Sequence, residues 1–152
     1  MPPDPVLVFE TKGWLRKASI DIRSAEHALT AIPPILTDVV YHSQQATEKA
    51  LKAFLVWNNI SFRKTHSIEE IGEQCLDVDS TLKTLIDQGA PLTQYAWEFR
   101  YPGDLEDPSQ EESEEALQVG KNIFQEILKR LPGDVRSYQA ENMKSKDGKS
   151  IP

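Results

Sequence analysis

The sequence predicts an all-α protein, an up-and-down bundle of about five helices. Apolar residues recur at every third or fourth position through most of the chain, which is the spacing of one helix face and not that of a strand. The length of 152 residues is that of one domain. Proline, glycine and helix-capping residues interrupt the pattern, and the short connections they mark make neighbouring helices antiparallel.

The first two helices carry the longest apolar stripes. The first is expected at about 11–31 and ends before Pro33 and Pro34, because proline lacks an N–H group and restricts the residue before it. The second is expected at about 37–58. Its inward side contains small residues, which allow a neighbouring helix to approach closely. These small residues are Ser43, Ala46, Ala50 and Ala53.

Shorter helices follow a loop. Ser67 and Glu70 have the spacing of a capping box, in which the serine oxygen accepts the N3 amide, so a third helix is expected at about 68–76. Another turn or two is expected at about 79–88, and Gly89 ends it because glycine is favoured after a helix.

A fourth helix is expected at about 91–100, ended by Pro102 and Gly103. Its inward residues would be Leu92, Tyr95, Ala96 and Phe99.

The last helix has the clearest beginning. Ser109 and Glu112 form a second capping box, and the apolar spacing then continues to about Arg130. The domain therefore covers about residues 10–131. The segment 132–152 is polar and lacks periodicity, so we expect a disordered tail.

Composition excludes several classes of function. The net charge of −7 argues against a broad electrostatic grip on duplex DNA or an anionic membrane. The single Cys75 excludes an internal disulfide and a cysteine zinc cluster, and the three histidines lack metal-ligand spacing, so no metal or cofactor is expected. No apolar run approaches the roughly 20 residues that span a bilayer. The N-terminus lacks the basic region of a signal peptide, and a cytoplasmic location is expected.

Four polar residues lie on one stripe of the second helix. His42, Gln45, Lys49 and Lys52 are spaced by three, four and three. Such side chains suit a phosphate or a base edge. The alternative is an ordinary solvated face, with Glu48 and Lys52 as an i,i+4 ion pair.

Arg100 is the other candidate, because it lies between two aromatic residues where a helix is expected to end. A guanidinium binds phosphate through two hydrogen bonds and stacks on aromatic rings, and Tyr101 could stack on a base. Asp104 could orient Arg100, or the arginine could form only a structural ion pair with Asp104, Glu106 or Glu98. His66 precedes a capped helix, and we interpret it as a loop anchor that donates to a backbone carbonyl rather than as a general base.

The segments YHSQQATEKALKAFL, THSIEEI and YAWEFRYPGD, followed by the acidic capped helix, resemble the HEPN domain in that order. The resemblance covers about residues 10–131. It implies a helical bundle that is usually a homodimer and is often paired with a minimal nucleotidyltransferase. Such pairs resemble toxin–antitoxin modules, or substrate-binding and catalytic subunits.

One branch of that family cuts RNA without a metal, using an arginine followed after four to six residues by a histidine. Arg100 is at the place of that arginine, but the positions where the histidine would stand hold Leu105, Glu106 and Asp107. In that chemistry the histidine handles protons and the arginine stabilises phosphorane charge. The missing histidine makes a catalytic residue unexpected here.

Three functions remain. The first is a non-catalytic homodimer that binds a nucleotide, or RNA, or the nucleotide-handling face of a nucleotidyltransferase. Its site would comprise His42, Gln45, Lys49 and Lys52 on one wall and Arg100, Tyr101 and Asp104 on the other. The second is a degenerate metal-independent RNase in which His42 or His66 replaces the missing base. The third is a purely structural dimerisation scaffold.

Overall fold

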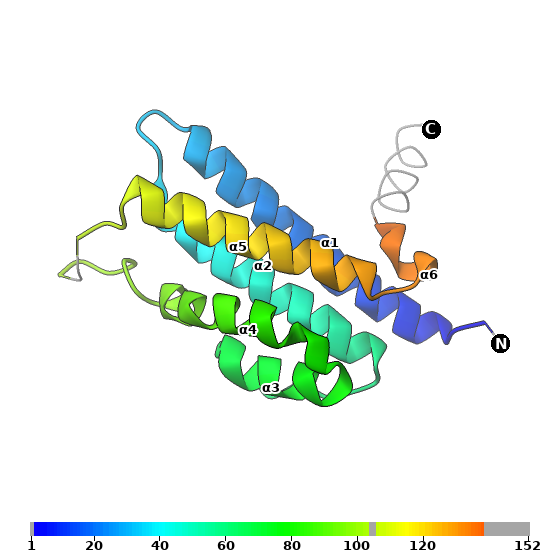
Figure 1. Cartoon of the computed structure of the whole chain (residues 1–152). Helices are drawn as coiled ribbons and strands as arrows, with labels where there is room; N and C mark the ends of the chain where they lie inside the picture. The colour runs from blue at the N-terminus through cyan, green and yellow to red at the C-terminus, as the bar shows by residue number, and fades with distance from the viewer. Residues whose placement is uncertain (1, 104–105, 139–152) are drawn as a thin grey trace, which may run out of the picture.

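The computed structural model describes residues 2–103 and 106–138. These residues form helices and contain no strand, so the predicted all-α class is confirmed (Figure 1). The α-helices are α1 (Pro5–Thr30), α2 (Leu36–Trp57), α3 (Ile68–Val78), α4 (Lys83–Gly89), α5 (Gln110–Lys129) and α6 (Gly133–Arg136). Two 3₁₀ helices, η1 (Ser80–Leu82) and η2 (Ala90–Ala96), flank α4.

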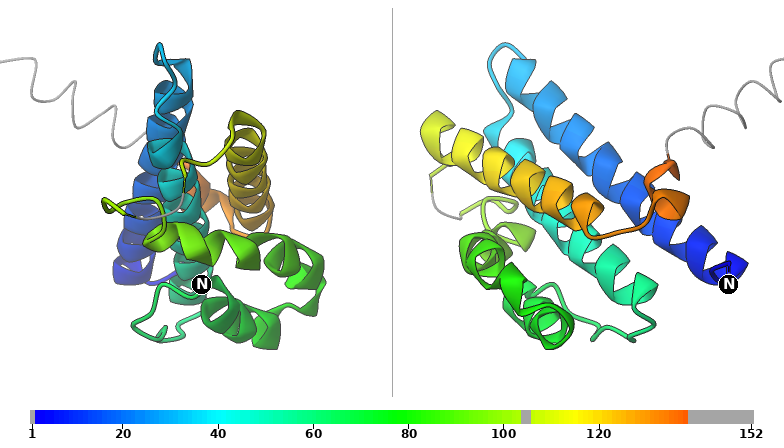
Figure 2. Two further views of the ribbon diagram at one scale, coloured as in Figure 1. Left: turned by 90° about the vertical axis from the view of Figure 1, so that its left-hand side faces the viewer. Right: turned by 45° about the vertical axis from the view of Figure 1, so that its right-hand side comes forward.

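Helix α2 is the centre of the fold. It packs along α1 on one side and α5 on another, and it also contacts α3 and η2 (Figures 1 and 2). The contact with α5 is close at Gly120, where an added Cβ would lie 3.1 Å from the backbone oxygen of Ser43. The small residues predicted on α2 are therefore used as expected, since Ser43, Ala46 and Ala50 are fully buried.

One apolar core holds the bundle together. It includes Leu15 from α1, Leu51 and Leu55 from α2, Ile71 from α3 and Ile127 from α5, all fully buried. Removing such side chains from water is the main favourable term in folding. None of the described helices is both long enough and apolar enough to cross a bilayer.

Both predicted capping boxes supply their serine caps. The Ser67 hydroxyl accepts the Glu70 amide at 3.3 Å, and the Ser109 hydroxyl accepts the Glu112 amide at 3.0 Å. Helix α1 begins earlier than predicted, because Asp4 caps it by accepting the Val6 amide at 2.9 Å.

The predicted helix at 91–100 is wrong in type and length. Helix α4 ends at Gly89 as expected, but the chain continues directly into the 3₁₀ helix η2, which ends at Ala96. Phe99 then has φ of 66°, in the left-handed region, and Gly103 has φ of 88°. Arg100 therefore lies in an irregular turn and not at the last position of a helix.

The predicted disorder from residue 132 is wrong for 132–138. Residues 133–136 form α6, where Val135 is fully buried, and the ring of Tyr138 meets that of Phe124 edge-on at 6.1 Å. The reason is that Val135 and Tyr138 lie three residues apart, on one side of a helical turn. Residues 139–152, the rest of the expected tail, lie outside the described residues.

Candidate functional site

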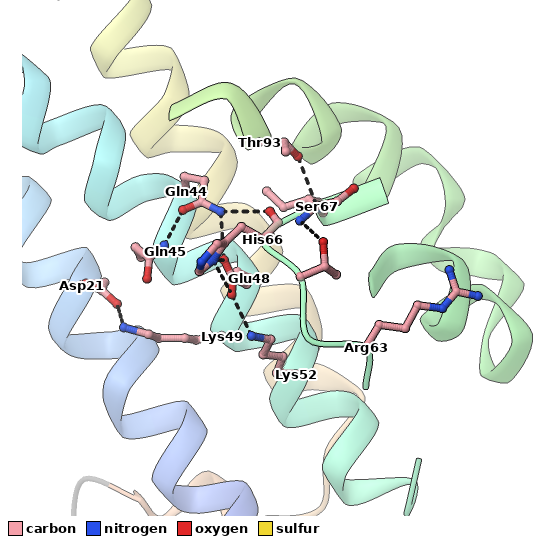
Figure 3. A network of polar contacts seen from close by, with 12 residues as sticks. Asp21, Gln44, Gln45, Glu48, Lys49, Lys52, Arg63, His66, Ser67 and Thr93 are labelled. Atoms are coloured by element: carbon pink, nitrogen blue, oxygen red, sulfur yellow. Dashed lines mark hydrogen bonds and ion pairs between the residues drawn. The ribbon is translucent and has the colours of Figure 1, made fainter. Parts of the chain in front are cut away.

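Buried polar side chains meet around Glu48, near the middle of α2. The carboxylate is 3% exposed, accepts Lys52 Nζ at 2.7 Å and accepts Gln44 Nε2 at 2.9 Å (Figure 3). The ring Nδ1 of His66 lies 3.2 Å from the same carboxylate. Gln44, Glu48, Lys52 and His66 are called the Glu48 network below.

Lys52 is enclosed in this network. Its ammonium lies 5.4 Å from the ring centre of Trp14 and 4.9 Å from that of Phe62, so two aromatic faces and one carboxylate surround the charge. The predicted ion pair of Glu48 with Lys52 is therefore present, but it is buried and not on a solvated face. An ammonium held in this way is not available to a ligand.

The pKa of Glu48 reflects two opposing effects. Burial disfavours the charged carboxylate and raises its pKa, but hydrogen bonds from Lys52 and Gln44, helped by the charge of Lys52 and by His66, outweigh burial. The net result is a pKa below the ordinary value of 4.5. Glu48 is therefore an anion at neutral pH, and its charge balances that of Lys52.

His66 anchors its loop, as predicted, but through a different partner. Its ring contacts the carboxylate of Glu48, while its backbone carbonyl accepts Gln44 Nε2 at 3.3 Å. The loop is fixed further where the amide of Ile68 donates to Thr93 Oγ1 at 3.1 Å. These contacts attach the start of α3 to α2 and η2.

A second buried carboxylate neutralises the remaining cation of the stripe. Asp21 of α1 accepts Lys49 Nζ at 2.6 Å and lies 2.8 Å from His42 Nδ1, and its side chain is 8% exposed. Gln45 donates to the side chain of Gln44 at 2.6 Å. The predicted polar stripe is thus largely engaged in contacts within the protein.

Arg100 stands apart from these networks. Its guanidinium carbon lies 4.3 Å from the ring centre of Tyr41, and Nη1 donates to the Ala96 carbonyl at 3.1 Å. In the described part of the chain it forms no ion pair with Glu98 or Glu106. A guanidinium has five N–H donors, and among the described residues the Ala96 carbonyl accepts one of them.

Arg100 lines a cavity of about 330 Å³, which is called the Arg100 cavity below. Its walls come from the first turns of α2 and from the irregular turn after η2. The lining residues are Thr37, Asp38, Tyr41, His42, Phe99 and Arg100. The structure therefore brings together two of the predicted site residues, His42 and Arg100, although they are far apart in sequence.

The other predicted residues lie elsewhere. Gln45, Lys49 and Lys52 do not line this cavity. Tyr101 follows Arg100 and is 66% exposed, and Asp104 lies outside the described residues.

Two residues of the site were not predicted from the sequence. Tyr41 stacks against Arg100, and Asp21 contacts the ring of His42. Tyr41 precedes His42 in the quoted motif, and its ring stacks against that of His42 at 5.3 Å, so proximity to His42 was one available signal. Asp21 had no signal, because an acidic residue in α1 reveals its partner in α2 only once the helices are packed.

Two cavities in the described part of the chain are larger than the Arg100 cavity. One of about 470 Å³ between α3 and α4 is lined by Glu69, Glu73 and Asp87 against the single cation Lys83. The excess of carboxylates would repel a phosphate. The other cavity, of about 420 Å³, is lined by the cations Arg23, Lys121 and Arg136 against the carboxylate of Glu26. In it Lys121 lies 3.3 Å from Glu26, and Arg136 Nε donates to a backbone carbonyl. The Arg100 cavity is the preferred candidate for an anionic ligand because its arginine is stacked on an aromatic ring and lies beside a histidine.

Comparison with known proteins places the fold in a family. The HEPN domain model matches residues 11–131, and the chain belongs to the HEPN domain family. It is also 29% identical over 140 aligned positions to a "Putative toxin MJ1304" of Methanocaldococcus jannaschii, an alignment that covers 78% of this chain and 91% of that protein. No solved structure matches the chain significantly.

Proposed function

We propose that this chain is a non-catalytic HEPN protein that binds a nucleotide in the Arg100 cavity and partners a minimal nucleotidyltransferase in a two-component, toxin–antitoxin-like module. One observation carries the proposal. Arg100 is stacked on Tyr41 and shares a cavity with His42, while the other cations considered for the site, Lys49 and Lys52, are each paired with a buried carboxylate.

The cavity has the chemistry of a phosphate site with a polar rim. Stacking on Tyr41 restricts the guanidinium before a ligand arrives, which reduces the ordering cost of binding. Thr37 and Asp38 belong to the first turn of α2, whose helix dipole places partial positive charge there. The Thr37 hydroxyl can donate to a phosphate, and the Asp38 carboxylate can accept from a ribose hydroxyl or an amino group of a base.

Size and position also favour a nucleotide. A volume of about 330 Å³ is at the lower end of that of small-molecule pockets, roughly 300–1,000 Å³. Tyr101, next to Arg100 and largely exposed, offers a ring on which a base can stack.

The partner is proposed from the family. The resemblance to the HEPN family implies a minimal nucleotidyltransferase as the partner, and the relative at 29% identity is named a putative toxin. Co-expression with a nucleotidyltransferase from an adjacent reading frame should yield a complex that survives size-exclusion chromatography. Separate elution of the two proteins at micromolar concentration would contradict this part of the proposal.

Nucleotide binding is tested by thermal shift against ATP, GTP, CTP, UTP and a short RNA. A ligand at about a hundred times its dissociation constant stabilises the protein by roughly 2.7 kcal/mol, which is several degrees for a domain of this size. Arg100→Ala should remove the shift. The matched control is Arg63→Ala, an exposed arginine 3.8 Å from Glu73, which should keep it. An unchanged shift in Arg100→Ala would contradict the proposal.

A second function is favoured by a specific observation, the presence of His42 beside Arg100 in the cavity. With Nδ1 at 2.8 Å from Asp21, the histidine is oriented by a carboxylate, as a general base often is. His42 would then accept the proton of an RNA 2′-hydroxyl as the 2′ oxygen bonds to phosphorus and the bond to the 5′ oxygen breaks. The 5′ oxygen would take a proton from water, and Arg100 would stabilise the phosphorane.

The RNase alternative predicts 2′,3′-cyclic phosphate ends and cleavage that continues in chelator. Both His42→Ala and Arg100→Ala should abolish it, whereas Arg63→Ala should not. Cleavage that is the same in all three variants would assign the activity to a contaminant.

A further inference from the structure

Helices α1, α5 and α6 line the cavity of about 420 Å³, which the proposed function does not use. Figure 2 shows α1 and α5 side by side and running in opposite directions, with α6 beside α1 at the end where α5 stops. The floor of this cavity is apolar, because it contains Ile22 of α1 with Phe124 and Leu128 of α5. The cavity is called the α6 groove below.

The rim of the α6 groove is positively charged, although the whole chain carries a net charge of −7. Arg23, Lys121 and Arg136 lie there with one carboxylate, that of Glu26. Lys121 is 3.3 Å from Glu26, so these two charges largely offset each other. Arg23 and Arg136 remain as an excess of positive charge, which attracts an anionic group.

Both arginines keep hydrogen-bond donors for a ligand. Within the described residues, the guanidinium of Arg23 takes part in no hydrogen bond or ion pair. Arg136 donates through Nε to the Leu131 carbonyl at 2.6 Å, and in the described part of the chain its two Nη groups have no acceptor. A guanidinium binds a carboxylate through two parallel hydrogen bonds, so either arginine is suited to an acidic side chain.

The floor of the α6 groove suits an aliphatic side chain better than a base. Phe124 is 4% exposed and Tyr138 is 5% exposed, and their rings meet edge-on at 6.1 Å. Neither ring therefore presents an open face on which a base could stack. Ile22 and Leu128 are partly buried and offer aliphatic surface beside the cationic rim.

We propose that the α6 groove binds an acidic segment of a partner protein. A large aliphatic side chain of that segment would lie on the floor, and a neighbouring carboxylate would pair with Arg23 or Arg136. This site shares no residue with the Arg100 cavity, and neither proposal depends on the other.

The length of the groove sets the motif. From Lys121 to Leu128, α5 rises about 10 Å at 1.5 Å per residue, which is the length of roughly three residues of extended chain. Side chains two positions apart point to the same side of such a chain. The motif is therefore a leucine or isoleucine with an aspartate or glutamate two positions away. A contact of this size gives a dissociation constant in the micromolar range.

The segment 139–152 of the chain itself follows Tyr138 directly but has the wrong charge for the groove. It contains three lysines against one glutamate and one aspartate. Like charges repel, so a net basic segment is disfavoured beside Arg23 and Arg136. An acidic segment from a different protein fits better.

Selection from a phage library of random hexapeptides on the wild-type protein tests the motif. The expected result is enrichment of sequences with an acidic residue two positions from leucine or isoleucine. A selected peptide labelled with fluorescein then gives a dissociation constant by fluorescence polarisation. No enrichment, or enrichment of sequences without an acidic residue, would overturn the proposal.

Two exposed residues of the rim should change the affinity for the labelled peptide in opposite directions. Arg23→Ala should weaken binding at least about tenfold, because it removes hydrogen bonds between charged groups. Glu26→Gln should strengthen binding a few-fold, because it removes a like charge and releases Lys121. The matched control Arg63→Ala should bind as wild type does. Unchanged affinity in Arg23→Ala, or weaker binding in Glu26→Gln, would overturn the proposal.

Competition separates the partner segment from other occupants. Neither ATP nor a synthetic peptide of residues 139–152 should displace the labelled peptide, and Arg23→Ala should keep any nucleotide thermal shift that Arg100→Ala removes. Displacement by ATP, or loss of the nucleotide shift in Arg23→Ala, would assign the α6 groove to a nucleotide. Displacement by the synthetic peptide would assign it to the chain's own segment. Either result would overturn the proposal.

Discussion

The Glu48 network and the Arg100 cavity use the same kinds of side chain in opposite ways. Each combines a cation, a histidine and an aromatic ring. In the network, Lys52 is surrounded by a carboxylate and two rings and has little access to solvent. In the cavity, Arg100 contacts one ring and one carbonyl and remains exposed. The comparison indicates that availability, and not residue type, separates a structural cation from one that can bind a ligand.

The largest effect on stability is expected at Glu48. Glu48→Ala leaves the buried ammonium of Lys52 without its carboxylate, and breaking a buried pair in this way costs about 3–5 kcal/mol. Urea unfolding measures the loss. Asp87→Ala breaks the exposed pair of Lys83 and Asp87 and should cost under about 1 kcal/mol. Equal losses in the two variants would mean that the network is no more important than a surface pair.

A smaller loss is expected at Asp21, which links the two regions by holding both Lys49 and His42. Asp21→Ala removes two hydrogen bonds to a carboxylate, each of which contributes about 1.5–3 kcal/mol. Because Lys49 is 24% and His42 33% exposed, water can hydrate both in the variant, and the total loss should stay below that of Glu48→Ala. The same urea titration tests this. A loss near zero would show that Lys49 and His42 find other partners, or water, at no cost.

The network should also weaken in acid. Because the folded-state pKa of Glu48 lies below the ordinary value of 4.5, its stabilisation is complete above that value and is lost as the pH falls through the lower folded pKa. The difference in unfolding free energy between wild type and Glu48→Gln should therefore narrow below about pH 4.5. A difference in unfolding free energy that stays constant down to the pH at which the protein unfolds would contradict the lowered pKa of Glu48.

The smallest stability effect is expected at Arg100. Arg100→Ala removes an exposed side chain with one backbone hydrogen bond and one contact with the Tyr41 ring, and the loss should stay below about 1 kcal/mol. Differential scanning fluorimetry without ligand should give a nearly unchanged melting temperature. A fall as large as that of Glu48→Ala would mean that Arg100 is a structural anchor.

The sequence predicted most of the fold because the fold follows local signals. The caps at Ser67 and Ser109 and the apolar spacing of α1, α2 and α5 are encoded within a few residues. The sequence did not predict the backbone of Phe99, which has φ of 66° although it is not a glycine, and whose ring packs against that of Tyr95.

Arg100 and His42 are among the residues that the sequence predicts for a binding site, and the structure places both in one cavity. The polar stripe of α2 is different, because helix spacing shows that Lys49 and Lys52 share a face but does not show what covers that face. The residues that cover Lys52, Trp14 and Phe62, belong to other segments of the chain, so only the packed structure reveals them.

Nucleotide binding in the Arg100 cavity is tested most directly by calorimetric titration of wild type, Arg100→Ala and Lys49→Met with the nucleotide that gives the largest thermal shift. If the nucleotide binds in the Arg100 cavity, Arg100→Ala should weaken binding at least about tenfold, or roughly 1.4 kcal/mol, while Lys49→Met should bind as wild type does. Wild-type affinity in Arg100→Ala, with binding lost in Lys49→Met, would place the ligand on the α2 stripe and contradict the assignment of the Arg100 cavity.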